Sequence, residues 1–351
     1  METRSALVAA RAKLGWSSET SLPELVNILV QADLRRAPAS FFSRRGLSPA
    51  MVLSVVILNW RNEADTIRCV GAVRGWGTLN PQIVVVDNQS TESSRAALAQ
   101  VVRPAELISS EVNLGYGGGN NLGIRRALEG RGEYILLLNS DAEIAEAALR
   151  SLIERLETHP EVSILGPVIY ERSEEGEYRY IGGRDIALSS HTRIAADTRD
   201  LHLIRGYPLI AVDYVPGTVF LARREAFEQT GLLDERFFFS GEIADFCRRA
   251  GDGKHGAYID LDVTATHDAT RIPRSRRDTL YVYYSLRNRM LYARKHYPAK
   301  TAKHLAFWTW VCALEIGRAL ARRDIPRSRA ILLALRHGYA NRSGNQNAAF
   351  L

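Results

Sequence analysis

The chain has 351 residues, of which 46% are hydrophobic and 24% charged, and its formal net charge is +7 at pH 7. This composition is ordinary for a globular protein with a substantial core. The positive balance favours an anionic partner: a nucleotide, a phosphorylated lipid, a membrane surface or nucleic acid. Three widely separated cysteines argue against a disulfide framework or a zinc site and fit a reducing compartment.

Membrane-spanning and export signals are not expected in this chain. No stretch reaches the roughly 18–20 apolar residues of a transmembrane helix. The short apolar stretch near the start is broken by Arg11 and Lys13, so no signal peptide is predicted. We therefore expect a cytoplasmic protein, and peripheral contact with the inner face of a membrane stays open.

Residues 1–50 are predicted to form a helical N-terminal extension and a linker. Ser21 and Glu24 have the spacing of a capping box before the apolar stretch LVNILV. Residues 35–49 have the composition of a linker, and nothing in this region indicates chemistry.

The pattern changes at residue 51, where apolar runs of strand length begin to alternate with amphipathic helical stretches. The runs are residues 51–58, 82–87, 106–110 and 134–139. Fully apolar strands that alternate with helices predict a parallel sheet covered on both faces. The fold class is therefore α/β, with a doubly wound, mostly parallel sheet.

The second half of the chain is more mixed. Strands are predicted over 163–170, at the start of 213–227 and over 256–267, a helix from about Ser240, and loops or hairpins over 171–210. Beyond Asp278 the chain is predicted to be helical to about Tyr339, with interruptions near Pro298 and Pro326. These patterns divide the chain into an extension (1–50), an α/β domain (51–270) and a basic helical region (271–351).

The stretch YILLLNSDAEI (134–144) begins as a buried strand and ends in polar residues without a turn glycine. One interpretation is a helix cap, with Ser140 or Asp141 capping a helix from Ala142 onward. The other is a metal or phosphate site at the carboxyl edge of the sheet, where open α/β sheets bind ligands.

Two further polar stretches follow the second and third strands. After the second strand, Asp87 could accept hydrogen bonds from a ribose or a base, or the stretch from Asp87 and Asn88 could begin a helix. The glycine-rich loop NLGYGGGNNLG (113–123) is expected to bring backbone amides close to an anion. It is not a dinucleotide fingerprint, because Asn120 stands where the third glycine is needed, and the acid precedes the glycines.

Acids and a histidine in the second half complete the candidate chemistry. Glu242 and Asp245 are three residues apart and share one helix face; the alternative is a solvated first turn. His267 ends a strand and is either a lone polar residue or, if it lies next to Asp141, part of a site for Mn²⁺ or Mg²⁺. Residues 271–303 hold ten basic residues and one acid, which fits a solvated face, a pyrophosphate, an anionic lipid surface or nucleic acid.

Several motifs in this order resemble the inverting family 2 glycosyltransferases of the GT-A fold, in the bacterial rhamnosyltransferase-like branch. They are SVVILNWRN, IVVVDNQSTE, NLGYGGGNNLGI, YILLLNSDAEI, VPGTVFLARREAFEQTGLLDERFF, FSGEIADFCRRA and YYSLRNRMLYARKHY. The resemblance runs from about residue 53 to 267, and more weakly to 344.

The resemblance implies a role for each candidate residue. Asp141 and His267 would bind the metal, Mn²⁺ or Mg²⁺, and Glu242 and Asp245 would be catalytic. Ile243 stands where the family commonly has its base, and Arg61 replaces a commoner Asn. Donor contacts are implied for Asn59, Trp60, Asn62, Asp87, Asn88, Asn113, Gly115, Gly117, Asn120, Asn139 and Ser140.

The activity implied is a single displacement, in which an acceptor hydroxyl attacks the sugar of a nucleotide-diphosphate donor and inverts its anomeric carbon. The acceptor would be a glycan or a lipid-linked molecule of bacterial surface glycan or glycolipid assembly, and no nucleic-acid partner is expected. Two alternatives remain: a non-catalytic nucleotide- or glycan-binding module, supported by Ile243, and a nucleotidyltransferase. The latter would normally have glycines with Arg or Lys directly after the first strand, which NWRNEADT does not have.

Overall fold

A computed structural model describes residues 53–173, 176–189, 193–195, 208–251, 256–268 and 274–350. The predicted extension and linker over 1–50 lie outside the described residues, and so does part of the predicted hairpin region over 171–210. Residues 51–196 and 208–351 belong to one compact unit, which therefore includes the C-terminal helices. The predicted boundary at 270 stays a prediction.

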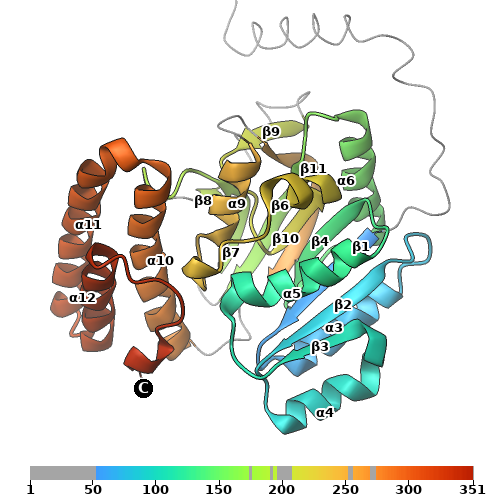
Figure 1. Cartoon of the computed structure of the whole chain (residues 1–351), viewed down its shortest axis with the longest axis horizontal. Helices are drawn as coiled ribbons and strands as arrows, with labels where there is room; N and C mark the ends of the chain where they lie inside the picture. The colour runs from blue at the N-terminus through green and yellow to red at the C-terminus, as the bar shows by residue number, and fades with distance from the viewer. Residues whose placement is uncertain are drawn as a thin grey trace, which may run out of the picture. The chain divides into compact units, whose positions relative to one another are not determined.

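The first half alternates strands and helices as the apolar runs predict (Figure 1). Its elements are β1 (Leu53–Asn59), α3 (Glu63–Arg74), β2 (Gln82–Asn88), α4 (Glu92–Val101), β3 (Leu107–Ser110), α5 (Gly115–Glu129), β4 (Tyr134–Asn139), β5 (Ala142–Glu143), α6 (Glu146–Thr158) and β6 (Ile164–Ser173). A short 3-10 turn, η2 (Pro104–Glu106), precedes β3.

The second half adds a small set of strands and then helices. Its elements are β7 (Gly176–Gly183), β8 (Arg193–Ala195), β9 (Leu209–Val212), β10 (Val219–Arg223), α8 (Arg224–Thr230), η3 (Glu235–Phe237), α9 (Glu242–Ala250), β11 (Ala257–Asp268), α10 (Arg274–His296), η5 (Pro298–Lys300), α11 (Thr301–Ala321), α12 (Ile325–Tyr339) and η6 (Asn347–Phe350). The helix interruptions predicted near Pro298 and Pro326 lie at η5 and at the start of α12.

The sheet is mixed and mostly parallel, in the order β3-β2-β1-β4-β10-β6-β11-β5. Strands β3, β2, β1 and β4 are parallel neighbours, and β6 is parallel to β11. Strand β10 runs antiparallel between β4 and β6. The predicted α/β class with a doubly wound, mostly parallel sheet is confirmed.

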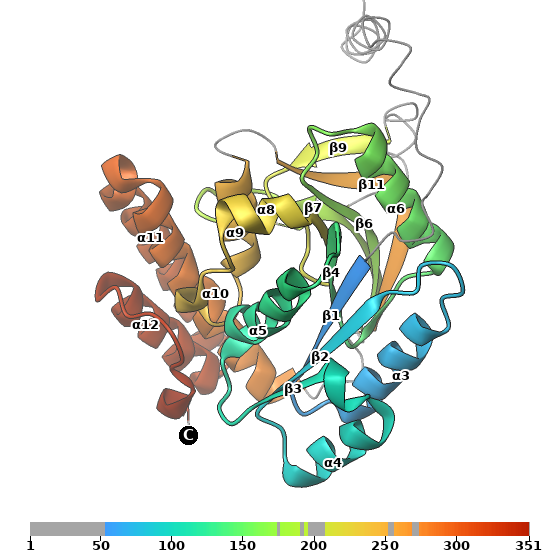
Figure 2. The same cartoon turned by 45° about the vertical axis from the view of Figure 1, so that its right-hand side comes forward.

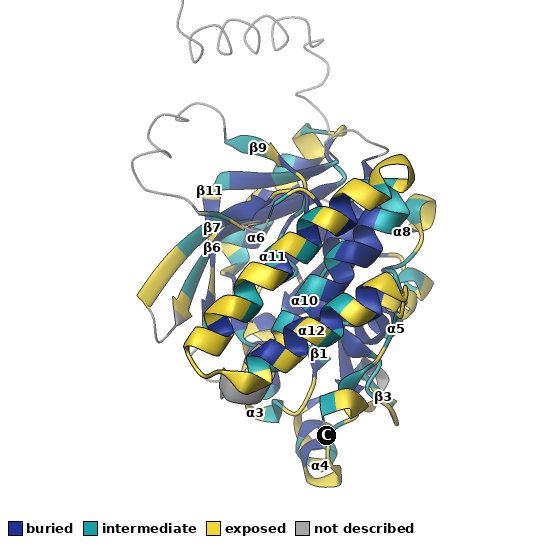
Figure 3. Cartoon of the chain, turned by 90° about the vertical axis from the view of Figure 1, so that its left-hand side faces the viewer, coloured by how far each residue is buried: buried dark blue, intermediate teal, exposed yellow. Residues whose placement is uncertain are grey.

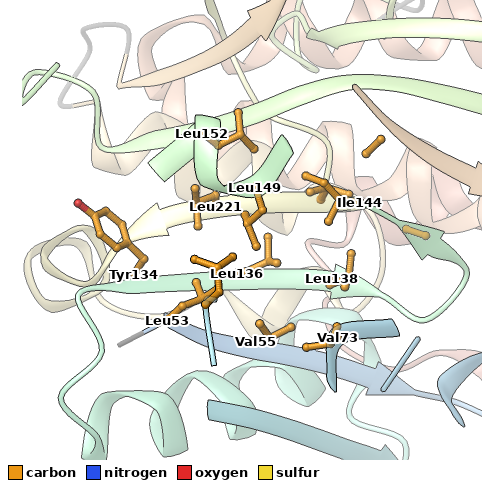
Figure 4. Close-up of a cluster of buried hydrophobic side chains, with 14 of the residues drawn as sticks. Leu53, Val55, Val73, Tyr134, Leu136, Leu138, Ile144, Leu149, Leu152 and Leu221 are labelled. Atoms are coloured by element: carbon orange, nitrogen blue, oxygen red, sulfur yellow. The ribbon is translucent and has the colours of Figure 1, made fainter. Parts of the chain in front are cut away.

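Alternate residues of the central strands enter two different cores. Leu53, Val55 and Ile57 of β1 pack with α3 and α6 in the larger core (Figure 4). Val56 and Leu58 point to the other face, where α5 lies against β1 and β2 (Figure 2). Because successive strand residues alternate between faces, an all-apolar strand requires a cover on both sides.

The helix-cap interpretation of Ser140 and Asp141 is wrong. A two-residue strand, β5, follows the turn at Asp141 and pairs antiparallel with β11. Helix α6 begins only at Glu146, and its N-cap residue, Ala145, has no side-chain cap. The polar end of β4 therefore delivers Asp141 to β11 rather than to a helix.

Candidate active site

The carboxyl ends of three parallel strands bring polar residues to one edge of the sheet. Asn59 ends β1, Asp87 and Asn88 end β2, and Asn139 ends β4. The strand register pairs Asn59 with Asp87 and Leu58 with Asn139, so these ends are level. This is the edge at which open α/β sheets bind their ligands.

Asp141 and His267 meet at this edge, as the sequence predicts. Strand pairing sets Ala142 opposite His267, and the Asp268 amide donates to the Asp141 carbonyl at 3.1 Å. Nε2 of His267 lies 3.3 Å from Oδ1 of Asp141. On the other side of the ring, Nδ1 lies 2.9 Å from Oε2 of Glu171, the residue opposite His267 on β6.

The donor set at His267 fits a divalent cation. Nε2 is buried and has no hydrogen-bond partner, since Asp141 lies at ion-pair distance without hydrogen-bond geometry. A metal-binding histidine commonly gives its other ring nitrogen to a carboxylate, which is the place of Glu171. Burial opposes protonation, but Asp141 and Glu171 outweigh it and raise the pKa of His267 to about 9, so a cation that binds Nε2 must displace a proton.

The parts of the chain that the structure describes do not supply a full set of protein ligands for the cation. No group of three or more His, Cys, Asp or Glu residues there could hold a metal ion. Mg²⁺-type sites that bind one or two protein side chains usually complete their coordination with substrate phosphates and water. Asp141 and His267 would be the protein's share of such a site, and their metal binding stays a prediction.

Asp87 is fully buried between two partners. Asn59 donates to Oδ1 of Asp87 at 3.2 Å, and Arg95 donates to Oδ2 at 3.2 Å. Asn59 also donates to Ser90 at 2.8 Å and accepts from Thr66 at 2.8 Å. In this structure the two residues hold the strand ends together, and their predicted contact with the donor stays a prediction.

Asn88 and Asn113 hold the start of α5 against β2. The Asn88 side chain accepts from the Leu114 amide at 2.8 Å and donates to the Gly115 carbonyl at 3.0 Å. It also donates to Asn113 at 3.2 Å, and Asn113 accepts from the Gly115 amide at 2.8 Å. The two predicted donor residues thus fix the helix start beside the sheet edge.

The prediction of a glycine-rich loop is wrong, because residues 115–119 already belong to α5. A Cβ on Gly119 would lie 2.5 Å from the Leu58 side chain, and one on Gly123 would lie 2.3 Å from Val56. Gly115 has φ +75°, and a Cβ there would lie 2.1 Å from the Phe238 carbonyl. These glycines let the helix approach the sheet and the segment before α9, and Gly117 lies beside Glu242.

Glu242 is the first residue of α9 and follows a strained turn. Phe238, Ser240 and Gly241 have φ values of 64°, 70° and 105°. The Glu242 side chain is buried, and its Oε2 has no hydrogen-bond partner. Burial raises the pKa of Glu242 to about 7; Asp245 adds to the rise, whereas backbone amides and Arg287 oppose it. A carboxylate with a pKa near 7 suits a general base.

Asp245 is in a different environment although it lies on the same helix. Its oxygens accept from Arg249 at 2.8 Å, and they lie 2.6 Å from Lys295 Nζ and 2.7 Å from His296 Nε2. Burial opposes ionisation, but these three groups outweigh it and lower the pKa of Asp245. This arrangement favours Glu242 as the base and Asp245 as a brace; the catalytic assignment of both stays a prediction.

Tyr116 connects the two acidic sites and was not anticipated from the sequence. Its hydroxyl donates to the Gly217 carbonyl at 2.8 Å, and the next residue, Thr218, accepts from the Asn139 amide at 3.0 Å. Burial, Glu242 and Asp141 together raise the pKa of the Tyr116 phenol. The Tyr116 hydroxyl thus links α5 to the segment at Gly217 and Thr218 that bonds the end of β4, and Gly117, the next residue of α5, lies beside Glu242.

The remaining predicted donor residues are placed around this edge. Trp60 is 44% exposed, with Arg61 5.9 Å from its ring, and Asn62 precedes α3 without capping it. Asn120 is buried and donates to the Tyr116 carbonyl at 2.9 Å, while Ser140 lies in the turn before Asp141. Of these, only the indole of Trp60 is widely exposed, and their donor contacts stay predictions.

Several residues whose roles were not predicted from the sequence make hydrogen bonds to segments that are far away in the chain. Asn121 of α5 holds Leu233 through both ends of its amide, at 2.9 and 3.0 Å. Arg287 and Asn288 of α10 bond the turn before Glu242, and Glu171 bonds His267. The motif YYSLRNRMLYARKHY contains Arg287 and Asn288, which was the available signal for them.

The comparison with known families identifies the class of this protein. Residues 54–231 match the family described as Glycosyl transferase family 2, so the chain belongs to this family and is a glycosyltransferase. It is 29% identical over 303 residues to the low-salt glycan biosynthesis hexosyltransferase Agl10 of Haloferax volcanii, over 83% of this chain and 92% of the relative.

A second relative is more distant. The chain is 26% identical over 185 residues to the N-acetylglucosaminyl-diphospho-decaprenol L-rhamnosyltransferase of Mycobacterium tuberculosis. That match covers 48% of this chain and 60% of the relative, less than two thirds of its length.

Two solved structures share the fold, which is the GT-A fold. The mannosyltransferase PcManGT from Pyrobaculum calidifontis, in complex with GDP-Man and Mn²⁺, matches with a TM-score of 0.51 and 14% identity over 96% of this chain and 98% of that chain. GalNAc-T7, with UDP, GalNAc and Mn²⁺, matches with a TM-score of 0.52 and 16% identity over 84% of this chain and 56% of that chain.

Proposed function

We propose that the protein is an inverting, metal-dependent glycosyltransferase that moves a hexose or deoxyhexose from a nucleotide-diphosphate sugar to an acceptor hydroxyl. The observation that carries this proposal is a pair of acidic sites: Asp141 with His267 at the strand ends, and the unpartnered Glu242 beside Gly117 in the first turn of α5. A transfer of this kind needs a place for a leaving diphosphate and a base near it.

In this proposal one site binds the cation and the other supplies the base. Asp141 and His267 would hold Mn²⁺ or Mg²⁺, with Glu171 orienting the imidazole. When bound, the cation neutralises the charge that develops on the departing diphosphate. Glu242 accepts the proton of the acceptor hydroxyl while that oxygen bonds to the anomeric carbon from the face opposite the diphosphate. The bond to the diphosphate breaks, the configuration inverts, and the proton stays on Glu242.

The comparisons support a role in the assembly of surface glycans or glycolipids. Relatives named above are a hexosyltransferase of glycan biosynthesis and a rhamnosyltransferase that acts on a lipid diphosphate. A neighbour of the same fold binds GDP-Man with Mn²⁺. We therefore propose a glycan or lipid-linked acceptor and place the chain near the rhamnosyltransferase-like branch.

A panel of nucleotide sugars with Mn²⁺ tests the proposal. A donor at 100 times its dissociation constant should stabilise the fold by about 2.7 kcal/mol, measured as a thermal shift. With acceptor present, the same donor should release its nucleoside diphosphate. If no nucleotide sugar in the panel shifts the transition or is consumed, the proposal is wrong.

A non-catalytic binding module is the second candidate, because Ile243 stands where relatives of this type commonly have a base. The panel separates the two functions: a module would be stabilised by a donor that it neither hydrolyses nor transfers. A nucleotidyltransferase would instead release pyrophosphate from a nucleoside triphosphate.

A further inference from the structure

The outer side of helix α11 is apolar although solvent covers it. At about 100° per residue, one side of the helix gathers positions three and four apart. The exposed residues on that side include Ala306, Trp310, Ala313, Leu314, Gly317 and Leu320, and Lys303 lies in line with Trp310 near the start of the helix. Trp310 is 60% exposed, whereas Trp308, on the inner side, is buried and donates to the Ala187 carbonyl at 3.1 Å. The fold therefore uses one side of α11 and leaves the other unpartnered within the described unit.

Helix α12 continues this surface with alternating apolar and basic residues. Its exposed side carries Ile325, Arg329, Leu332, Arg336 and Tyr339. The two helices lie side by side with their exposed sides on the same face of the molecule (Figure 3). They are joined by a 2.8 Å hydrogen bond between the hydroxyls of Thr309 and Tyr339. We call these residues of α11 and α12 together the α11–α12 outer face.

The charge around this face is strongly positive. Residues 300–342 contain nine Lys and Arg residues but only two acids, Glu315 and Asp324. Glu315 is already paired with Arg318 at 2.5 Å and with Arg327 at 3.3 Å. Lys303, Arg318, Arg322 and Arg323 are exposed near the two ends of α11. A partner that covers the apolar residues therefore meets mostly uncompensated positive charge.

We propose that the α11–α12 outer face docks onto an anionic lipid surface. A helix that presents Trp and Leu on one side, with Arg and Lys at its edges, is the type that lies in a membrane interface. Long basic side chains reach lipid phosphates while their stems cover apolar surface, and an indole suits the headgroup level. None of the helices in the described part of the chain has the length and apolar content of a transmembrane span.

Binding to lipid is independent of sugar transfer and can be measured without any sugar. The full chain is sedimented with vesicles of phosphatidylcholine alone and of phosphatidylcholine mixed with phosphatidylglycerol. We expect binding to the mixed vesicles only, and a decline with added salt, because the headgroup attraction is screened. Equal binding to both vesicle types, or to neither, would overturn the proposal.

Paired variants locate the contact. The double variant Trp310→Ser/Leu314→Ser should lose vesicle binding, whereas Val101→Ser/Val112→Ser, at exposed apolar sites elsewhere, should keep it. Arg329→Gln/Arg336→Gln should weaken binding about fivefold for each charge removed, which corresponds to about 1 kcal/mol per basic residue near the surface. Arg125→Gln/Arg126→Gln on α5 is the matched control. All four variants replace exposed side chains, and a thermal scan checks that they fold.

Two further results would contradict docking of the α11–α12 outer face onto lipid. If both surface variants bind mixed vesicles as the unaltered chain does, another part of the protein makes the contact and the proposal is wrong. If light scattering shows a lipid-free dimer that Trp310→Ser/Leu314→Ser dissociates, and vesicles are not bound, the face joins two copies of this chain instead.

Discussion

Two acids one helical turn apart show how environment separates their chemistry. Glu242 is buried with a free oxygen and a pKa raised to about 7, whereas Asp245 is held by Arg249, Lys295 and His296, which lower its pKa. A base must be unpaired and must titrate near the working pH, whereas a carboxylate that holds neighbouring side chains in place through ion pairs must stay charged. Only Glu242 meets the first condition.

The pH dependence of Glu242 gives the first prediction. Acting as base, Glu242 must be ionised, so turnover should rise as pH increases through about 7. Glu242→Gln should lower turnover by about 10²–10⁴-fold and leave donor affinity nearly unchanged. Steady-state kinetics across pH 5–9 measure both, and a variant with near-normal turnover would exclude Glu242 as the base.

The same pKa carries a stability prediction with a defined sign. The folded pKa of about 7 exceeds the ordinary value of 4.5, so folding favours the protonated form. The stability that this gives is complete below pH 4.5 and is lost as pH rises through about 7. Glu242→Gln should therefore gain stability relative to the unaltered chain between pH 5 and 8, by about 1–3 kcal/mol. Asp245→Asn should lose stability instead, because it removes the carboxylate that Arg249, Lys295 and His296 share, and of these Lys295 keeps Asp234.

The metal-type site gives a prediction that needs no turnover. Asp141→Asn and His267→Gln should abolish Mn²⁺ binding in the presence of donor. Electron paramagnetic resonance measures this, because the free Mn²⁺ signal falls when the unaltered chain binds the ion and should stay intact with these variants. Glu171→Gln should weaken it about 10–100-fold, because Glu171 only orients the imidazole. Glu143→Gln, an exposed carboxyl on β5, is the control. Unchanged Mn²⁺ affinity in Asp141→Asn would reject this site.

At the scale of single elements, α10 determines the shape of the turn that carries Glu242. The Asn288 side chain donates to the carbonyls of Phe237 and Phe239 at 2.9 Å and to that of Ser240 at 2.5 Å. The buried Arg287 donates to Phe237 as well, at 2.8 Å. These bonds hold a segment in which two non-glycine residues have positive φ, a conformation that needs support from its surroundings.

Asn288→Ala should therefore act on turnover through Glu242. It leaves the carbonyls of Phe239 and Ser240 without their side-chain donor, whereas Phe237 keeps Arg287. Each buried group left unsatisfied costs about 1–3 kcal/mol. We expect a lower kcat with little change in donor KM, and a pH–rate profile whose midpoint moves, because the burial of Glu242 changes. A loss of stability with an unchanged kcat and pH profile would reduce Asn288 to a purely structural role.

The glycines of α5 offer a prediction with an internal control. Gly123→Ala should destabilise the fold by about 1–3 kcal/mol, because its Cβ would lie 2.3 Å from Val56 in a packed layer. Gly71→Ala on α3 meets nothing within 4 Å and should stabilise the helix by about 0.5–1 kcal/mol. Denaturant unfolding measures both, and equal effects would mean that the glycine positions are not set by packing.

The sequence predicts where single strands lie, but it does not predict which strands pair or which side chains that pairing brings together. Apolar runs predicted β1, β2 and β4 to within two residues, because each strand is buried on both faces. Nothing in the stretch VFLAR reveals that β10 inserts antiparallel between β4 and β6, because strand partners are not encoded locally. Glu171 and Tyr116 were missed for the same reason: their roles exist only once β6 and α5 are in place.

At the scale of the molecule, the C-terminal residues return to the sheet domain. The Gly344 amide donates to the Arg236 carbonyl at 2.7 Å, and the Gly344 carbonyl accepts from Arg287 at 2.7 Å. Asn345 reaches the Asn113 carbonyl at 3.5 Å, close to the start of α5. The helices after residue 270 thus support both the turn before Glu242 and the loop beside the strand ends.

This arrangement predicts that the sheet and the C-terminal helices unfold together, and three buried thiols can report it in the unaltered chain. Cys69 lies on α3, Cys247 on α9 and Cys312 on α11, and all three are free and buried. Burial, reinforced for Cys69 by Asp141 and Glu143, raises the pKa of Cys69 to about 12, and burial raises that of Cys312 to about 11. Brief alkylation at increasing urea, read by peptide mass spectrometry, therefore labels each thiol only when its surroundings open.

Because Arg287, Asn288 and the returning chain at Gly344 cross between the two regions, neither region can lose its packing without leaving buried polar groups of the other unsatisfied. The three labelling curves should therefore share one midpoint, as in a two-state transition. Deleting residues 342–351 should move all three midpoints to lower urea together. If Cys312 reacts at a lower urea concentration than Cys69 in the full chain, residues 271–351 are a separate folding unit, and the coupling from α10 to Glu242 does not contribute to stability.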